Sequence, residues 1–123
     1  MKSLYKLIIV SIALALSYGS AFSQCSTGEV SVELIVSTDQ YGYEGYWEIV
    51  PTGNNCGVGT IASGGNSSVG CTGAGAQSQI PGGYGNNQTI NEGPWCLVQG
   101  ASYDIIYVDD YADGGFEFEV TVN

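Results

Sequence analysis

Apolar and polar residues alternate along two stretches at opposite ends of the chain. Over residues 30–37, valine and leucine occupy every second position, and over 116–122 phenylalanine and valine alternate with glutamate and threonine. Successive side chains of a β-strand point to opposite faces, so this period of two predicts two strands that each bury one face. The outer face of the second strand carries Glu117 and Glu119. That face is expected to be strongly acidic.

Short runs rich in aromatic and β-branched residues predict three further strands. They span 46–50, 95–99 and 103–108 and are bounded by Gly, Pro or Asn. Short edge strands are also expected at 58–62 and 89–90. No stretch beyond residue 23 has a helical period. These elements predict an all-β fold, an antiparallel, jelly-roll-like β-sandwich.

The middle of the chain differs in composition from both ends. Residues 51–94 are dominated by Gly, Asn, Ser and Thr. A free linker of that length would be unusual inside a compact domain. We therefore expect this Gly-rich segment to be pinned by the cysteines that lie within it and just after it.

The first residues have the features of an export signal. Lys2 and Lys6 are followed by an apolar run over 7–16, and the segment 21–23 is a small-x-small cleavage site. The run is shorter than the roughly 20 residues of a membrane-spanning helix, and no second apolar segment follows. We predict a signal peptide at 1–23 and one secreted domain at 24–123, located outside the cell or on its surface.

All four cysteines lie in the predicted secreted domain. An oxidising compartment favours two disulfides, whereas a zinc site is disfavoured because the sequence has no histidine and no CxxC pair. If the first two strands form a hairpin, the cysteine before it and the one after it lie at the same end. This reasoning predicts the pairs Cys25–Cys56 and Cys71–Cys96.

The predicted secreted domain contains twelve carboxylates and no Lys, Arg or His. Its self-repulsion can be relieved only by solvent, salt or bound cations. The missing basic patch argues against nucleic acids and anionic membranes as partners. Without histidine there is no Ser-His or Cys-His nucleophile system. Two carboxylates would suffice for glycoside hydrolysis, but a small sandwich leaves little room for a substrate cleft, so we expect a non-enzyme.

Two segments, 39–46 and 109–116, share one pattern: Asp, any residue, Tyr, three residues, Gly, aromatic. Each follows a predicted strand, and both loops would emerge at one end of the sandwich if those strands run parallel. Ca²⁺ accepts about six to eight oxygen ligands in irregular geometry. Alternatively, the Asp and Gly residues only form turns. The candidate ligands of a Ca²⁺ site are Asp39, Glu44, Asp109, Asp110 and Asp113.

Three tyrosines within these acidic loops are candidate ligand contacts. Aromatic faces stack on sugar rings, and neighbouring carboxylates accept hydrogen bonds from hydroxyl groups. The three are Tyr41, Tyr43 and Tyr111. Trp47, by contrast, is in phase with Ile49 and is expected in the core.

These motifs resemble those of a small extracellular β module found in secreted proteins of Bacteroidetes-type bacteria. Residues 39–48 match D-x-Y-x-x-E-x-x-W-E, and 109–114 are similar to D-S-Y-G-D-G. Ala112 and Gly115 replace a usual Gly and a usual Trp, which leaves the carboxylates in place but puts a Trp-dependent contact in doubt. The resemblance implies an extracellular binding or structural role.

We therefore expect a non-catalytic module that binds Ca²⁺ and serves adhesion or recognition of an extracellular glycan or protein partner. The alternative is a structural or protein-interaction subunit of an extracellular assembly. In that case exposed edge strands and the Gly-rich segment would contact the partner, and the acids would serve only solubility.

Overall fold

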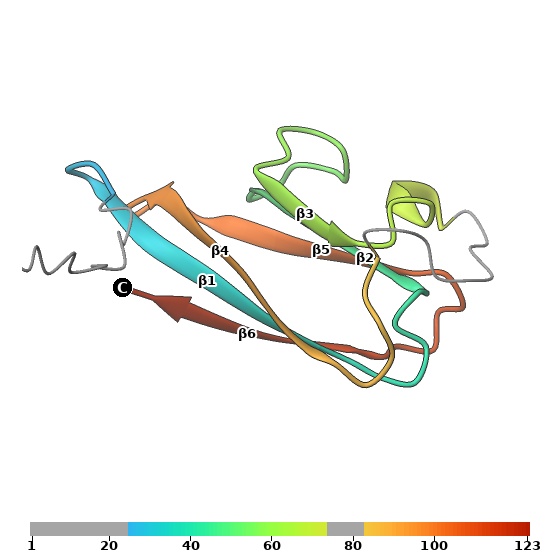
Figure 1. Cartoon of the computed structure of the whole chain (residues 1–123). Coiled ribbons are helices and arrows are strands. Elements are labelled where there is room, and N and C mark those ends of the chain that lie inside the picture. The colour runs from blue at the N-terminus through green and yellow to red at the C-terminus, as the bar shows by residue number, and fades with distance from the viewer. Residues whose placement is uncertain (1–24, 74–82) are drawn as a thin grey trace, which may run out of the picture.

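The computed structural model describes residues 25–73 and 83–123 (Figure 1). The predicted signal peptide and part of the Gly-rich segment lie outside these residues. No helix in the described residues has both the length and the apolar character needed to cross a membrane. The elements are β1 (Glu29–Thr38), β2 (Gly45–Pro51), β3 (Ala62–Gly65), the 3₁₀ turn η1 (Gly70–Thr72), β4 (Thr89–Val98), β5 (Tyr103–Asp109) and β6 (Phe116–Val122).

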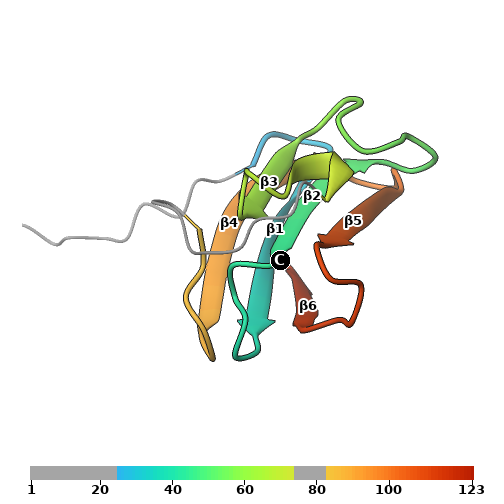
Figure 2. The same cartoon turned by 90° about the vertical axis from the view of Figure 1, so that its right-hand side faces the viewer.

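The six strands form two three-stranded sheets, which lie face to face (Figure 2). One sheet has the order β4-β1-β6 and the other β3-β2-β5, and every pairing is antiparallel. The predicted antiparallel β-sandwich is confirmed. Both the β1–β2 and the β5–β6 connections pass from one sheet to the other, so the two acidic loops are the crossovers at one end.

The core lies between the sheets and is built from the alternating positions of β1 and β2. Leu34 and Val36 from β1 pack with Trp47 and Ile49 from β2. Trp47 is fully buried, which confirms its predicted place in the core. Its indole N–H donates a hydrogen bond of 2.9 Å to the hydroxyl of Tyr84, which comes from the Gly-rich segment. A core residue is thus supplied by a part of the chain with no strand pattern.

Two strand predictions need correction. The pieces expected at 89–90 and 95–99 belong to one strand, β4, in which Gly93 has φ +99° and the register against β1 shifts between Val32 and Leu34. This irregularity lets the strand continue past Pro94. The edge strand expected at 58–62 is wrong, because the pairing with β2 covers Ala62–Gly65 instead.

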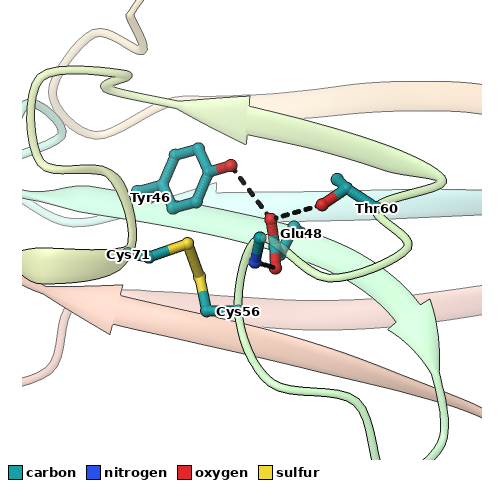
Figure 3. Close-up of a disulfide and its surroundings, with 6 residues drawn as sticks. Tyr46, Glu48, Cys56, Thr60 and Cys71 are labelled. Carbon is teal, nitrogen blue, oxygen red and sulfur yellow. Dashed lines mark hydrogen bonds between the residues drawn. A yellow bond between two sulfur atoms is a disulfide. The ribbon is translucent and has the colours of Figure 1, made fainter.

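The predicted disulfide pairing is also wrong. The bonds are Cys25–Cys96 and Cys56–Cys71. The prediction assumed a β1–β2 hairpin, but β1 pairs with β4 and places Ser31 opposite Cys96. Cys25, just before β1, therefore meets the end of β4, while the other pair joins the loop after β2 to η1 (Figure 3).

Candidate functional site

The two acidic loops begin with the same local structure. The Oδ1 atom of Asp39 accepts a hydrogen bond of 2.8 Å from the amide of Tyr41, and Oδ1 of Asp109 accepts one of 3.1 Å from the amide of Tyr111. The shared Asp-x-Tyr pattern thus folds into the same Asp-capped turn twice. These two aspartates have the turn-forming role that was the alternative to metal binding, and each still has lone pairs for a cation.

Backbone hydrogen bonds hold the loops side by side. The amide of Asp110 donates to the carbonyl of Glu44 at 2.9 Å, and the amide of Asp39 donates to the carbonyl of Gly115 at 3.0 Å. A Cβ atom on Gly115, whose φ is +123°, would lie 2.8 Å from a carboxylate oxygen of Asp39. Glycine is favoured where the resembling motif has Trp, because other residues rarely adopt this φ and a side chain would displace the Asp39 carboxylate.

The end of the Gly-rich segment braces the first acidic loop from its other side. The amide of Asn87 donates to the carbonyl of Asp39 at 2.6 Å, and the amide of Gly42 donates to Oδ1 of Asn86 at 3.0 Å. A Cβ atom on Gly42 would lie 2.1 Å from the carbonyl oxygen of Gly85. Sequence reasoning missed this contact, since nothing in a Gly- and Asn-rich run indicates which loop it will touch.

Three of the five predicted metal ligands come together. Carboxylate oxygens of Glu44, Asp109 and Asp113 all lie within 4.8 Å of one another. Glu44 is only 7% exposed, whereas Asp113 is exposed, so the group is open to solvent on one side. Asp39 lies close enough to act electrostatically on Glu44. Asp110 is outside the group of three and contributes its backbone amide.

The electrostatics of this carboxylate group oppose ionisation of Glu44. Burial raises the pKa of Glu44, and the neighbouring Asp113, Asp109 and Asp39 raise it further, while a hydrogen bond with Tyr43 acts in the opposite direction. Residues 24–123 contain no cationic side chain that could offset the repulsion. An added cation would do so, because it interacts favourably with every member of the group.

The predicted tyrosine contacts lie beside the carboxylates. The rings of Tyr41 and Tyr43 meet edge to face with centroids 6.2 Å apart. Tyr41 and Tyr111 are exposed, and Tyr43 is partly buried. Burial raises the pKa of the Tyr43 hydroxyl, and the charges of Glu44 and Tyr111 add to the effect. Aromatic rings and carboxylates therefore share one surface at this end of the sandwich.

A second acidic site was not predicted and is structural. Glu48 is buried in β2, and its carboxylate accepts hydrogen bonds from the hydroxyls of Tyr46 and Thr60 and from the amide of Gly57 (Figure 3). It also lies within 4.8 Å of the sulfurs of Cys56 and Cys71. Those sulfurs are bonded to each other, so they offer no thiolate to a metal. The carboxylate instead fastens the loop after β2 to the sheet.

No protein-family model matches the chain, and no curated protein or solved structure is detectably similar to it.

Proposed function

We propose that the protein is a secreted, non-catalytic binding module that holds Ca²⁺ between its two acidic loops. The observation that carries the proposal is the buried Glu44 carboxylate, which faces Asp109 and Asp113 in a domain without a cationic side chain. Three carboxylates held this close together, one of them on a buried residue and none paired with a cation, repel one another and lower the stability of the fold. A bound cation would remove that cost.

The distances permit Ca²⁺, and the ligand chemistry favours it. Two oxygens that each lie about 2.4 Å from the same ion are at most about 4.8 Å apart. The oxygens of Glu44, Asp109 and Asp113 satisfy this limit. A set of carboxylates on two irregular loops, with Asp39 nearby, suits a large ion with irregular coordination better than Mg²⁺, which requires near-octahedral geometry.

Secretion and the absence of catalysis are further parts of the proposal. The two disulfides are typical of proteins from oxidising compartments, and the N-terminal sequence has the pattern of an export signal. All four cysteines are oxidised and the sequence has no histidine, so the usual nucleophile and base pairs cannot be assembled.

The surface next to the carboxylates of Glu44, Asp109 and Asp113 is proposed to contact an extracellular glycan or protein partner in adhesion. Tyr41 and Tyr111 expose their rings beside the carboxylates. Aromatic faces bind sugar rings, and a bound Ca²⁺ would add coordination sites for sugar hydroxyls. Binding should then require both the ion and the rings.

A glycan array with and without chelator tests the adhesive role. The wild type is expected to retain defined glycans in Ca²⁺ and to lose them in EDTA. Tyr111→Ala should lose them in both conditions. Val58→Ala, which changes an exposed apolar residue between β2 and β3, outside the acidic loops, is the control and should behave like the wild type. Glycan retention that is unaffected by EDTA would contradict the proposed role of the ion.

A further inference from the structure

Strand β6 ends its sheet with one edge free of any described strand. Asn123, just after β6, and Ser31 of β1 exchange both backbone hydrogen bonds, at 2.9 and 3.0 Å. Hydrogen-bonded and non-hydrogen-bonded pairs alternate along an antiparallel ladder. With the register of β6 against β1, the N–H and C=O groups of Phe118, Val120 and Val122 therefore point away from β1, toward the free edge.

The apolar side chains of the same strand are only partly covered. Val120 and Val122 belong to the face that turns toward the other sheet, yet they are 50% and 59% exposed. The predicted burial of this strand face is thus wrong at its second half. Both valines line a cleft of about 480 Å³ between the sheets. Its other lining residues include Val30, Ile105 and the start of the β4–β5 turn at Gln99.

The remaining edges are better protected against strand addition. Strand β3 has four residues, and β4 carries Pro94 and a register shift. Every residue of β5 is at least partly buried. Strand β6 has seven residues without Pro, Gly or a bulge, and it lies beside β5 on one side of the sandwich (Figure 2). It therefore lacks the short length, the proline and the bulge by which edge strands usually avoid pairing, and of the usual protections it keeps only charged side chains.

Charge decides what can pair with this edge. Glu117 and Glu119 alternate with the apolar residues and occupy the exposed outer face of β6. A second copy paired through β6 would place glutamates against glutamates, and residues 24–123 offer no cation to neutralise them. Like charges opposite each other destabilise a strand pair, whereas opposite charges stabilise it. The edge is thus complementary to a basic strand and not to itself.

We propose that β6 accepts an extended segment of a partner polypeptide as an additional strand. Apolar residues at alternate positions of the segment would cover Val120 and Val122 and enter the cleft. Lys or Arg residues between them would face Glu117 and Glu119. The cleft lies at the end of the sandwich opposite the acidic loops, so this interaction does not depend on Ca²⁺.

The probe is a capped peptide of about seven residues in which Val alternates with Lys, matched to the length of a typical strand. Backbone hydrogen exchange is followed by NMR on the whole labelled protein. The amides of Val120 and Val122 are expected to exchange fast in the free protein and to become protected when the peptide binds. A control peptide carries N-methyl groups on the amides that would face β6. It keeps the same charge but cannot donate these hydrogen bonds, so it should not protect the Val120 and Val122 amides from exchange.

Variants separate strand addition from simple charge attraction. Val120→Asp should weaken peptide binding at least about tenfold in Kd, which corresponds to about 1.4 kcal/mol. Val58→Asp changes a valine of similar exposure, 54%, outside the cleft and should leave binding unchanged. The double variant Glu117→Lys with Glu119→Lys should prefer a peptide in which Glu replaces Lys. Melting curves of all variants are expected to match the wild type, because each changed side chain is exposed.

Four results of the peptide titration in Ca²⁺ would overturn the proposal. They are equal binding of the N-methylated peptide, protection at a different strand edge, self-association of the free protein with Val120 already protected, and no binding at about millimolar peptide. Repeating the titration in EDTA distinguishes peptide binding at β6 from any effect of the proposed Ca²⁺ site. Peptide binding that persists without Ca²⁺ is the expected result, and a requirement for Ca²⁺ would show that the segment binds elsewhere.

Discussion

The amide of Asp110 donates a hydrogen bond of 2.9 Å to the carbonyl of Glu44, and this bond joins the two acidic loops next to their carboxylates. A second bond, from the amide of Asp39 to the carbonyl of Gly115, does the same on the other side. The loops are thus held by backbone contacts that need no ion. The carboxylate group is preformed, and its repulsion is a cost carried by the folded state.

Removing the charge of Glu44 should therefore stabilise the ion-free protein. In EDTA, Glu44→Gln is expected to raise the free energy of unfolding, because it ends the repulsion with Asp109 and Asp113. The same change should weaken Ca²⁺ binding. Urea unfolding and calorimetric titration measure the two effects, with Glu117→Gln on the outer face of β6 as the control. A variant less stable than the wild type in EDTA would contradict this account.

The pH dependence of stability follows from the raised pKa of Glu44. A carboxyl whose pKa is higher in the folded than in the unfolded state binds its proton more tightly when folded. Its contribution to stability therefore increases as the pH falls through the folded-state pKa toward the ordinary value near 4.5. In EDTA, the stability advantage of Glu44→Gln should be largest near neutral pH and should shrink on acidification. An advantage that stays constant from neutral pH down to about pH 4, below the ordinary carboxyl value, would refute the raised pKa of Glu44.

The two disulfides should differ in their contribution to stability. Cys25–Cys96 spans 71 residues and Cys56–Cys71 spans 15. Chain entropy then predicts a loss of about 4 kcal/mol for the Ser double variant of the first pair and about 3 kcal/mol for that of the second. Denaturant unfolding of both variants shows which of them loses more free energy of unfolding. A larger loss for the shorter loop would show that native contacts outweigh the entropic effect.

Glu48 should contribute to stability through the loop that it holds. Glu48→Gln replaces an acceptor oxygen by the NH2 of a side-chain amide, a donor that would face other donors, and it is expected to cost about 1.5 to 3 kcal/mol. Thr60→Val removes one of the three hydrogen bonds and should cost about 1 kcal/mol. Glu119→Gln, an exposed acid, serves as the control for loss of charge. Wild-type stability of Glu48→Gln would mean that the carboxylate does not anchor the loop.

Much of the sandwich could be predicted because its strands carry local signals. The alternation in β1 and the phase of Trp47 with Ile49 depend only on the period of a strand. The matched Asp-x-Tyr pattern likewise indicated two equivalent turns. These features are set by residues that are neighbours in the chain.

The predictions that were wrong or missing concern contacts between segments that are distant in the sequence. Which strand lies next to β1 decides the partner of Cys25, and no local pattern specifies that choice. Apolar and polar residues alternate in β6 as they do in a strand with one buried face. Val120 is nevertheless exposed, and among the described residues no strand lies beside β6 on its outer edge. The brace from Asn86 and Asn87 likewise comes from a segment with no periodicity. Tertiary pairing therefore decided what the sequence pattern left open.

Calorimetric titration of the metal-free protein with Ca²⁺ tests the central claim most directly. The wild type is expected to bind one ion and to gain about 2.7 kcal/mol of stability when free Ca²⁺ is about a hundredfold above Kd. Asp113→Ala removes the side-chain ligand at an exposed position, so it should keep the fold and lose both binding and stabilisation. Glu119→Gln should bind like the wild type. No heat of binding and an unchanged melting curve for the wild type in millimolar Ca²⁺ would contradict the account.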